Sequence, residues 1–421
     1  MTTVVDLANQ GFTTDDLGTL RDLNARAQAL RAQEASTGII GDQPGPASQQ
    51  WRKPRLRVLA NGQEVNGAVS ATVTQNSWNA AGRFEVEVAL GADPGLTYSS
   101  YWDRQELIEI DVQMALLGDG APEGSGSWQS MIQGEVDQMR LAIQHNTLRI
   151  EGRDLTARLR DTKIQEAFSN KTASEIAEVI AGRHGLQAHV TRTSTLVGQY
   201  YQLEHDKITL GNFHRETTEW DLLVYLAQYE GAENGGFDVF IENNTLYFQP
   251  RIPPDQDPFT IRYQKGSGQN SIPIMNVTSL QMEHSLILAR DVQVTVKTWN
   301  SKRKTPFTKI IKAQGTHRGG GTQAPAQNYV LILPNKTPDE ALKIGQAYLS
   351  ELTKHERVIH VTMPGDVLLT PRNMVQLVGT GTTFDISYYI SEIERTIDFE
   401  GGFTQRVLCK NSSPRSQVTV S

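Results

Sequence analysis

Apolar side chains recur at every second position through much of residues 51–153. This is the spacing of half-buried antiparallel strands, whose alternate side chains face the core. Asn61-Gly62 and His145-Asn146 supply residues that tolerate a positive φ, as tight hairpin turns require. A series of short strands joined by such turns predicts a small barrel or sandwich. The alternating runs are Leu56/Val58, Phe84/Val86/Val88/Leu90, Ile108/Ile110/Val112/Met114, Met139/Leu141/Ile143 and Leu148/Ile150.

The apolar spacing changes to that of helices after residue 160. Thr172 and Glu175 have the spacing of a capping box, and apolar residues follow them at intervals of three and four. A second helix is predicted to begin at Thr218, with Asp221 three residues later. Two alternating runs come after this helix and indicate a hairpin. Residues 160–250 are therefore predicted to form an α+β unit.

The period of two resumes beyond the proline-rich stretch 251–258. Inside this region Pro338 follows Thr337 and precedes two acidic residues, which predicts a helix with proline at its first position. We expect this helix to span residues 338–356 and to be inserted between the strands of a second β domain. The alternating runs are Val292/Val294/Val296, 374–378, Tyr388/Ile390 and 403–409.

The two β regions resemble each other locally. Residues 134–137 (GEVD) lead through a hairpin to 148–150 (LRI), much as residues 391–394 (SEIE) lead to 406–408 (RVL). A strand with a period of two precedes each of these hairpins. The likeness predicts a duplicated barrel, although chance similarity between two hairpins is the alternative.

The first 50 residues differ from the rest of the chain. An apolar stripe follows the acidic start Asp15-Asp16 and predicts a short amphipathic helix, formed by Leu17, Leu20, Leu23, Ala27 and Leu30. A stretch rich in Gly, Pro and Gln comes next and is typical of a linker. The helix either folds back on its own domain or reaches a neighbouring subunit.

Together these patterns predict an α+β, mainly β chain with two small related antiparallel β-barrels, an inserted α+β domain and an N-terminal helical extension. A chain of 421 residues is longer than one hydrophobic core usually supports. The expected domains are residues 1–50 (helix and linker), 51–158 (first barrel), 159–272 (α+β insert), 273–412 (second barrel with the inserted helix) and 413–421 (C-terminal tail).

Charge and composition restrict the class of protein. There are 40 Lys and Arg against 47 Asp and Glu, and the net charge of −7 gives no overall attraction to nucleic acid or to an anionic membrane. The single cysteine, Cys409, allows neither an intramolecular disulfide nor a cysteine-based zinc site, and we expect a buried thiol. We expect no signal peptide and no membrane span, and hence synthesis in the cytoplasm.

The sequence contains no P-loop, dinucleotide fingerprint, nucleophile elbow or paired-histidine zinc motif. His205-Asp206 and His214 are scattered and are expected to be solvated. The carboxylate pairs Glu135/Asp137 and Glu392/Glu394 would suit a glycosidase, but residues two apart in a strand share one face, and a solvent-facing hairpin is preferred. We therefore predict no enzyme activity and no catalytic, cofactor or metal site.

Two basic clusters could meet an acidic neighbour or nucleic acid. One comprises Lys302, Arg303 and Lys304 with Lys309 and Lys312; the other comprises Arg52, Lys53, Arg55 and Arg57. Neither is interleaved with the aromatic residues that single-stranded nucleic acid stacks on, and solvated surface is the preferred interpretation.

Several segments look like the phage tail hub family, which includes the late control protein D group, the hubs of contractile tails and the hub part of type VI secretion spike proteins. The resemblance covers residues 51–412 in the same order of elements, although Pro371-Arg372 stands where the family often has Pro-Gly. The segments are 150–159 (IEGRDLTARL), 171–177 (KTASEIA), 184–186 (HGL), 218–223 (TEWDLL), 236–239 (GFDV), 246–248 (LYF), 364–368 (PGDVL), 388–390 (YYI) and 402–404 (GFT).

This resemblance implies a structural homotrimer without a cofactor, located in the tail tip or baseplate of a virion. Its two similar barrels per subunit would join a sixfold tail tube to a threefold central spike around a channel for tape measure and genome. The implied partners are the chain itself, a tail tube or distal tail protein, the central spike protein and the tape measure protein, with baseplate wedge proteins as further candidates.

Two alternatives stay open at this point. A tail-associated enzyme that degrades peptidoglycan would use Glu135 or Glu392. A type VI secretion spike hub is the other; because such spikes usually continue into a β-helical needle, whose repeat is absent up to Ser421, we expect the phage assembly.

Overall fold

The structure, a computed structural model, confirms the mainly β character. It describes residues 53–77, 80–91, 102, 104–117, 128–164, 168, 171–194, 218–234, 237–250, 258–266, 273–285, 292–300, 305–313, 327–334, 338–353, 357–411 and 418–420. The predicted helix and linker of residues 1–50 lie outside the described residues.

The first β module contains all the strands predicted from the alternation between residues 51 and 153. Its strands pair antiparallel in the order β2-β1-β5-β6-β7-β4-β3. In β4, for example, Phe84, Val86 and Val88 are buried and the residues between them face outward. The strands are β1 (Lys53–Ala60), β2 (Gln63–Glu64), β3 (Ala68–Asn76), β4 (Arg83–Ala89), β5 (Glu109–Leu117), β6 (Gln129–Ala142) and β7 (Thr147–Asp154).

The second β module is built from strands that lie later in the chain. Its order is β12-β11-β18-β19-β20-β17-β13. Ile359, Tyr388, Ile393 and the predicted buried thiol Cys409 lie in its core. The strands are β11 (Phe259–Gln264), β12 (Ile274–Met275), β13 (Ser279–His284), β17 (Arg357–Pro364), β18 (Met374–Val378), β19 (Ser387–Asp398) and β20 (Gly402–Asn411).

The two modules share one topology. With the short strands β2 and β12 set aside, the remaining strands, numbered in chain order, have the order 1-4-5-6-3-2 in both modules. The hairpins whose sequences resemble each other, β6–β7 and β19–β20, occupy the same positions, and each contains a bulge. The modules differ at the first strand, which pairs antiparallel in the first module and parallel in the second.

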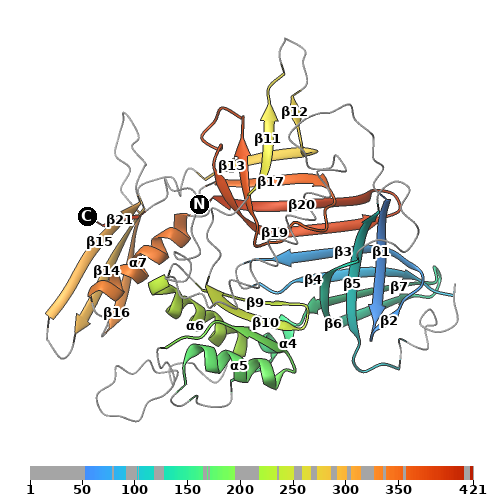
Figure 1. Ribbon diagram of the computed structural model, residues 1–421, viewed down its shortest axis with the longest axis horizontal. Coiled ribbons are helices and arrows are strands. Elements are labelled where there is room, and N and C mark those ends of the chain that lie inside the picture. The colour runs from blue at the N-terminus through green and yellow to red at the C-terminus, as the bar shows by residue number, and fades with distance from the viewer. Residues whose placement is uncertain are drawn as a thin grey trace.

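The expected closed barrels are not found as continuous hydrogen-bonded sheets. Instead, β3 pairs with β19, and the two modules form one 14-stranded sheet. In Figure 1 the red and orange strands of the second module lie directly above the blue strands of the first. The two edge strands of each module are consecutive in the chain: β2 and β3 in the first module, and β12 and β13 in the second. Within the described residues, no hydrogen-bonded ladder joins these edge strands to each other.

The α+β unit follows the first module. Helices α4 (Thr156–Asp161), α5 (Ala173–Arg183) and α6 (Glu219–Asn234) pack with the three-stranded sheet β8-β10-β9 around their own core. The predicted capping box of Thr172 and Glu175 is confirmed. The buried Glu219 of α6 accepts hydrogen bonds from Arg183 and His184 at the end of α5. The strands are β8 (Gln187–Val190), β9 (Phe237–Glu242) and β10 (Thr245–Pro250).

The region between β13 and β17 differs from the expectation of one inserted helix. Val294 and Val296, which the alternation assigned to the second barrel, belong to a separate four-stranded sheet, β16-β14-β15-β21, with its own core beneath α7. The described helix ends at Thr353, and residues 354–356 lie outside the described part. The elements are β14 (Val292–Asn300), β15 (Thr305–Ala313), β16 (Gln327–Pro334), α7 (Pro338–Thr353) and β21 (Val418–Val420), the last from the predicted C-terminal tail.

Candidate functional site at the seam between the β modules

Strand β19 is shared by the two modules and forms the seam between them. Its first residues pair with β18, whereas Glu392 to Ile397 pair with β3. The change of partner occurs at the bulge between Ile390 and Glu392. Ser77 satisfies carbonyls at this bulge, because its hydroxyl donates to the Ile390 oxygen at 2.8 Å and its amide donates to the Ser391 oxygen at 3.0 Å.

A buried arginine holds the seam from inside. Arg395 is 1% exposed, and its guanidinium donates to the backbone oxygens of Asp366 and Leu369 and, at 2.6 Å, to Oε1 of Gln75. Gln75 in turn donates from Nε2 to the Met131 oxygen at 2.6 Å. Burial lowers the pKa of Arg395 to about 10, so the side chain stays charged at neutral pH.

The turn between β17 and β18 is closely packed against β20. The Gly365 amide donates to the Phe403 oxygen at 2.8 Å, and a Cβ on Gly365 would lie 2.3 Å from the Phe403 ring. Only glycine fits this approach. Phe403 and Ile397 themselves pack into the core of the first module, so the hydrophobic contact continues across the seam.

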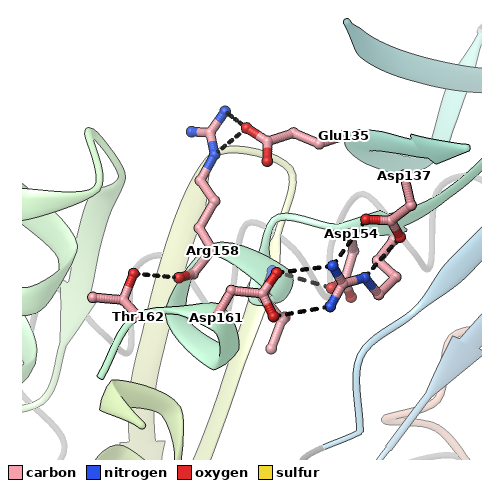
Figure 2. A network of polar contacts seen from close by, with 8 residues as sticks. Glu135, Asp137, Asp154, Arg158, Asp161 and Thr162 are labelled. Atoms are coloured by element: carbon pink, nitrogen blue, oxygen red, sulfur yellow. Dashed lines mark hydrogen bonds and ion pairs between the residues drawn. The ribbon is translucent and has the colours of Figure 1, made fainter. Parts of the chain in front are cut away.

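A network of charged side chains connects the first module to α4 (Figure 2). Arg153 donates to both carboxylate oxygens of Asp137 at 2.7 and 2.8 Å and to Oδ2 of Asp161 at 2.8 Å. Arg158 donates to Glu135 and to Glu109, each at 2.6 Å. The hydrogen bonds from Arg153 lower the pKa of Asp161. These pairs connect strands β5, β6 and β7 to the helix that follows them.

A buried carboxylate lies at the same junction. Asp154 accepts hydrogen bonds from the amide of Gly82 at 2.6 Å and from the amide of Thr156 at 3.0 Å, so it joins the start of β4 to the start of α4. Burial raises its pKa to about 6. A group with this pKa changes charge in the weakly acidic range.

A third junction connects the β17–β18 turn to the α+β unit. The Arg372 guanidinium stacks 3.7 Å from the centroid of the Phe240 ring and donates to Oε2 of Glu242 at 2.9 Å. Phe240 stacks on Tyr247 with centroids 4.8 Å apart. Arg372 stands where the hub family often has glycine, and here its side chain contacts the α+β unit directly.

The carboxylate pairs considered for catalysis are engaged in structural contacts. Glu135 and Asp137 each pair with an arginine, Arg158 and Arg153 respectively. Glu392 and Glu394 lie in the ladder of the seam, and Glu394 is 3.4 Å from Arg406. The structure places the two pairs on different hairpins, β6–β7 and β19–β20. His205, Asp206 and His214 lie outside the described residues.

The two basic clusters lie on separate sheets. Lys53, Arg55 and Arg57 are on β1, where Arg57 donates to Gln113 at 2.9 Å and lies 4.5 Å from the Trp128 ring centroid. Lys309 and Lys312 are on β15. The remaining members, Arg52 and residues 302–304, lie outside the described residues.

The described residues contain neither a metal-binding cluster nor a membrane-spanning helix. No cluster of three or more His, Cys, Asp or Glu side chains in the described ranges is arranged to bind a metal ion. None of the described helices combines the length and apolar character needed to cross a membrane.

The residues that hold the seam were missed by the sequence analysis. Arg395 lies among alternating residues of an ordinary strand pattern, and its burial depends on partners far away in the chain. The only sequence feature that singled out Arg372 was that Pro371-Arg372 stands where the hub family often has Pro-Gly. Asp154 lies within a segment that carries the family resemblance, but nothing in its local pattern indicated a buried carboxylate.

Comparison with solved structures confirms the expected similarity to phage tail proteins at the level of the fold. A tail protein from Neisseria meningitidis MC58 matches with a TM-score of 0.58 and 14% identity, over 86% of this chain and 99% of that chain. The prophage MuSo2 43 kDa tail protein from Shewanella oneidensis matches with a TM-score of 0.56 and 18% identity, over the same shares of the two chains. No protein-family model and no curated protein sequence matches the chain.

Proposed function

We propose that this chain is a structural hub subunit of a phage-type tail, without enzyme activity or cofactor. In this proposal three copies form a ring that joins a sixfold tail tube to a threefold central spike and surrounds the channel for tape measure and genome. The first β module corresponds to domain 51–158, and the α+β unit corresponds to most of the insert 159–272. The second β module takes β11 (Phe259–Gln264) from that insert together with strands of domain 273–412. The protein is assembled in the host cytoplasm and resides in the tail tip or baseplate of the virion.

The observation that carries this proposal is the repeated strand order 1-4-5-6-3-2 in two modules fused through β3 and β19. Three copies of a chain with two similar modules present six near-equivalent surfaces, while the ring as a whole keeps threefold symmetry. A duplicated subunit can therefore contact a sixfold tube on one side and a threefold spike on the other. The fold shared with tail proteins over most of the chain supports the same assignment.

The seam suits this role because the two modules must keep a fixed angle for six surfaces to be equivalent. A continuous ladder, a shared core and a buried arginine all restrict movement of one module relative to the other. The expected partners are further copies of the chain, a tail tube or distal tail protein, the central spike protein, the tape measure protein and baseplate wedge proteins.

The test is the mass and symmetry of the assembly in solution. We expect native mass spectrometry to give a trimer, alone or with a tube or spike protein of the same tail. Electron microscopy of that particle should show six β modules around a central axis. A monomer under all conditions, including with those partners, would refute the proposal, as would modules that do not line a common ring.

A further inference from the structure

The four-stranded sheet has one covered and one open surface. Helix α7 packs on the surface formed by Val294, Val296 and Ile311. Because side chains alternate along strands, the residues between these face the opposite side. We call that side the outer face. Its exposed members are Lys297, Trp299 (50% exposed), Ile310 (39%), Lys312, Val330 (52%) and Ile332 (70%).

The apolar members of the outer face are neighbours in the sheet register. Val330 and Ile310 both lie opposite Thr295, and Ile332 lies opposite Lys297. Trp299 is two residues beyond Lys297 on the same side of β14. Among the described residues of β14, β15 and β16 that face this side, none is acidic, and Lys297 and Lys312 are basic. The outer face is therefore apolar and positively charged.

A second exposed feature has the complementary chemistry. Phe399 lies in the turn between β19 and β20 and is 84% exposed. Its neighbours in the chain are Asp398, which accepts a hydrogen bond from the Gly401 amide, and the exposed Glu400. We call residues 398–400 the Phe399 turn. It presents one aromatic ring between two carboxylates, on a hairpin held by the seam.

We propose that the Phe399 turn of one copy of this chain docks on the outer face of the next copy. The aromatic ring would pack on Ile332, Val330 and Trp299, and the carboxylates would lie near Lys297 and Lys312. Contact between the exposed aromatic ring and the open apolar sheet would remove both apolar surfaces from water. The opposite charges of the two features would fix the orientation of the contact. The inference deepens the ring proposed above and depends on it.

The two surfaces lie on different parts of the molecule, so the contact is of the head-to-tail kind. In Figure 1 the sheet of β14, β15 and β16 lies at the left end of the long axis, whereas β19 and β20 run towards the right. A head-to-tail contact between identical copies generates a closed ring when the rotation closes. Each copy then uses its Phe399 turn once and its outer face once.

The first experiment introduces a carboxylate into each surface separately. Phe399→Glu and Ile332→Glu change exposed side chains, so the fold should be retained, and each should weaken self-association at least about tenfold in sedimentation velocity. Ile143→Glu is the matched control, because Ile143 is 77% exposed near the turn of the related β6–β7 hairpin. The control should associate like the unchanged chain. Unchanged association of both test variants would overturn the inference.

The second experiment mixes the two defective variants. The Phe399→Glu copy keeps a sound outer face, and the Ile332→Glu copy keeps a sound Phe399 turn, so one contact can form between them but no ring can close. We expect a one-to-one dimer in the mixture and monomers in each variant alone. A mixture that stays monomeric, or that forms full rings, contradicts the head-to-tail contact.

The third experiment traps the contact covalently. Phe399→Cys together with Ile332→Cys in one chain should give disulfide-linked oligomers under mild oxidation, whereas either substitution alone should not. The native Cys409 is buried and burial raises the pKa of its thiol, so it contributes little background. Absence of linked oligomers from an assembled double variant would contradict the contact.

The outcomes separate this inference from the proposed function. If the unchanged chain forms a trimer that both carboxylate variants leave intact, the ring stands and the docking contact is refuted. If Ile332→Glu leaves the trimer intact but abolishes binding of a tube or spike protein, the outer face binds that protein and the inference is again refuted. A chain that never assembles refutes the proposed function itself.

Discussion

Arg395 places a positive charge where water does not reach it. Its guanidinium is compensated by two backbone oxygens and by Gln75, and this explains why a lowered pKa of about 10 still leaves it charged. Removing the guanidinium leaves three acceptors in the seam without this donor. Each buried acceptor left without a partner costs about 1 to 3 kcal/mol.

We therefore expect Arg395→Met to lower the free energy of unfolding by about 3 kcal/mol, measured by denaturant titration, because three acceptors lose their donor. Arg406→Met, on the neighbouring strand β20, is the control, because its side chain is 76% exposed and its ion pair with Glu394 is at the surface. The control should stay within about 0.5 kcal/mol of the unchanged chain. Equal effects of the two changes would show that Arg395 does not hold the seam.

Asp154 makes the stability of the fold depend on pH, in the direction opposite to that of most carboxylates. Its pKa is raised from 3.8 to about 6 in the folded state, so between these values the folded chain binds more protons than the unfolded chain. Stability therefore falls as pH rises through this window. The contribution of the protonated Asp154 to the free energy of unfolding is complete below about pH 4 and lost above about pH 6. The loss is roughly 3 kcal/mol, at 1.36 kcal/mol per pKa unit.

We expect Asp154→Asn to remove this dependence. The difference in unfolding free energy between the unchanged chain and the variant, measured from pH 4 to pH 7, should shift by roughly 3 kcal/mol in favour of the variant as pH rises. Asp161→Asn is the control, because the hydrogen bonds from Arg153 lower the pKa of Asp161. Its difference from the unchanged chain should therefore not shift in favour of the variant as pH rises. A pH-independent difference for Asp154→Asn would show that the carboxylate is ionised throughout.

At the scale of elements, the seam depends on how closely the β17–β18 turn approaches β20. Gly365→Ala would place a methyl group against the Phe403 ring, which is fixed because it also packs into the first module. Neither side can move away without opening a core. Overpacking of this kind costs about 1 to 3 kcal/mol.

We expect Gly365→Ala to lower the melting temperature, as observed by calorimetry or circular dichroism. Gly182→Ala gives the matched comparison, because a Cβ at this exposed position of α5 meets no atom within 4 Å. The change should raise stability by about 0.5 to 1 kcal/mol through helix propensity. If Gly365→Ala behaved like Gly182→Ala, the turn would be more loosely packed than its geometry indicates.

At the scale of the whole molecule, one segment contacts all three larger units. Residues 364–373 receive hydrogen bonds from Arg395 of β19 and, through Gln75, connect to the first module. Arg372, in the same segment, stacks on Phe240 and pairs with Glu242 of the α+β unit. This segment therefore connects the α+β unit to the two β modules, in addition to the ion pairs between the first module and α4.

We expect Arg372→Ala to increase amide hydrogen exchange in β9 and β10 while leaving the β3–β19 ladder unchanged. Arg372→Lys should give a smaller increase, because lysine keeps the charge but loses the planar stacking. Arg406→Ala should change neither region. Faster exchange spread evenly over the whole chain would instead indicate a global loss of stability.

The sequence by itself determined the local structure of this protein. Alternation of apolar residues predicted β1 and β4 to β7 of the first module and β18, β19 and β20 of the second. The spacing of Thr172 with Glu175 predicted α5, because side-chain period and capping depend on residues a few positions apart. The likeness of two hairpins predicted a duplication, and the repeated strand order agrees with it. The expectation of a role in assembly came from the resemblance of several segments to the phage tail hub family.

Only the tertiary structure decided how these elements combine. The β3–β19 ladder joins the expected barrels into one sheet, the strands around Val294 form a sheet of their own, and Gln75 meets Arg395 across 320 positions of the chain. Strand alternation states which side chains are buried but not which strand will cover them. The partner of each strand depends on the packing of complete sheet faces. The Arg395 charge becomes buried only when the faces of the two modules pack together.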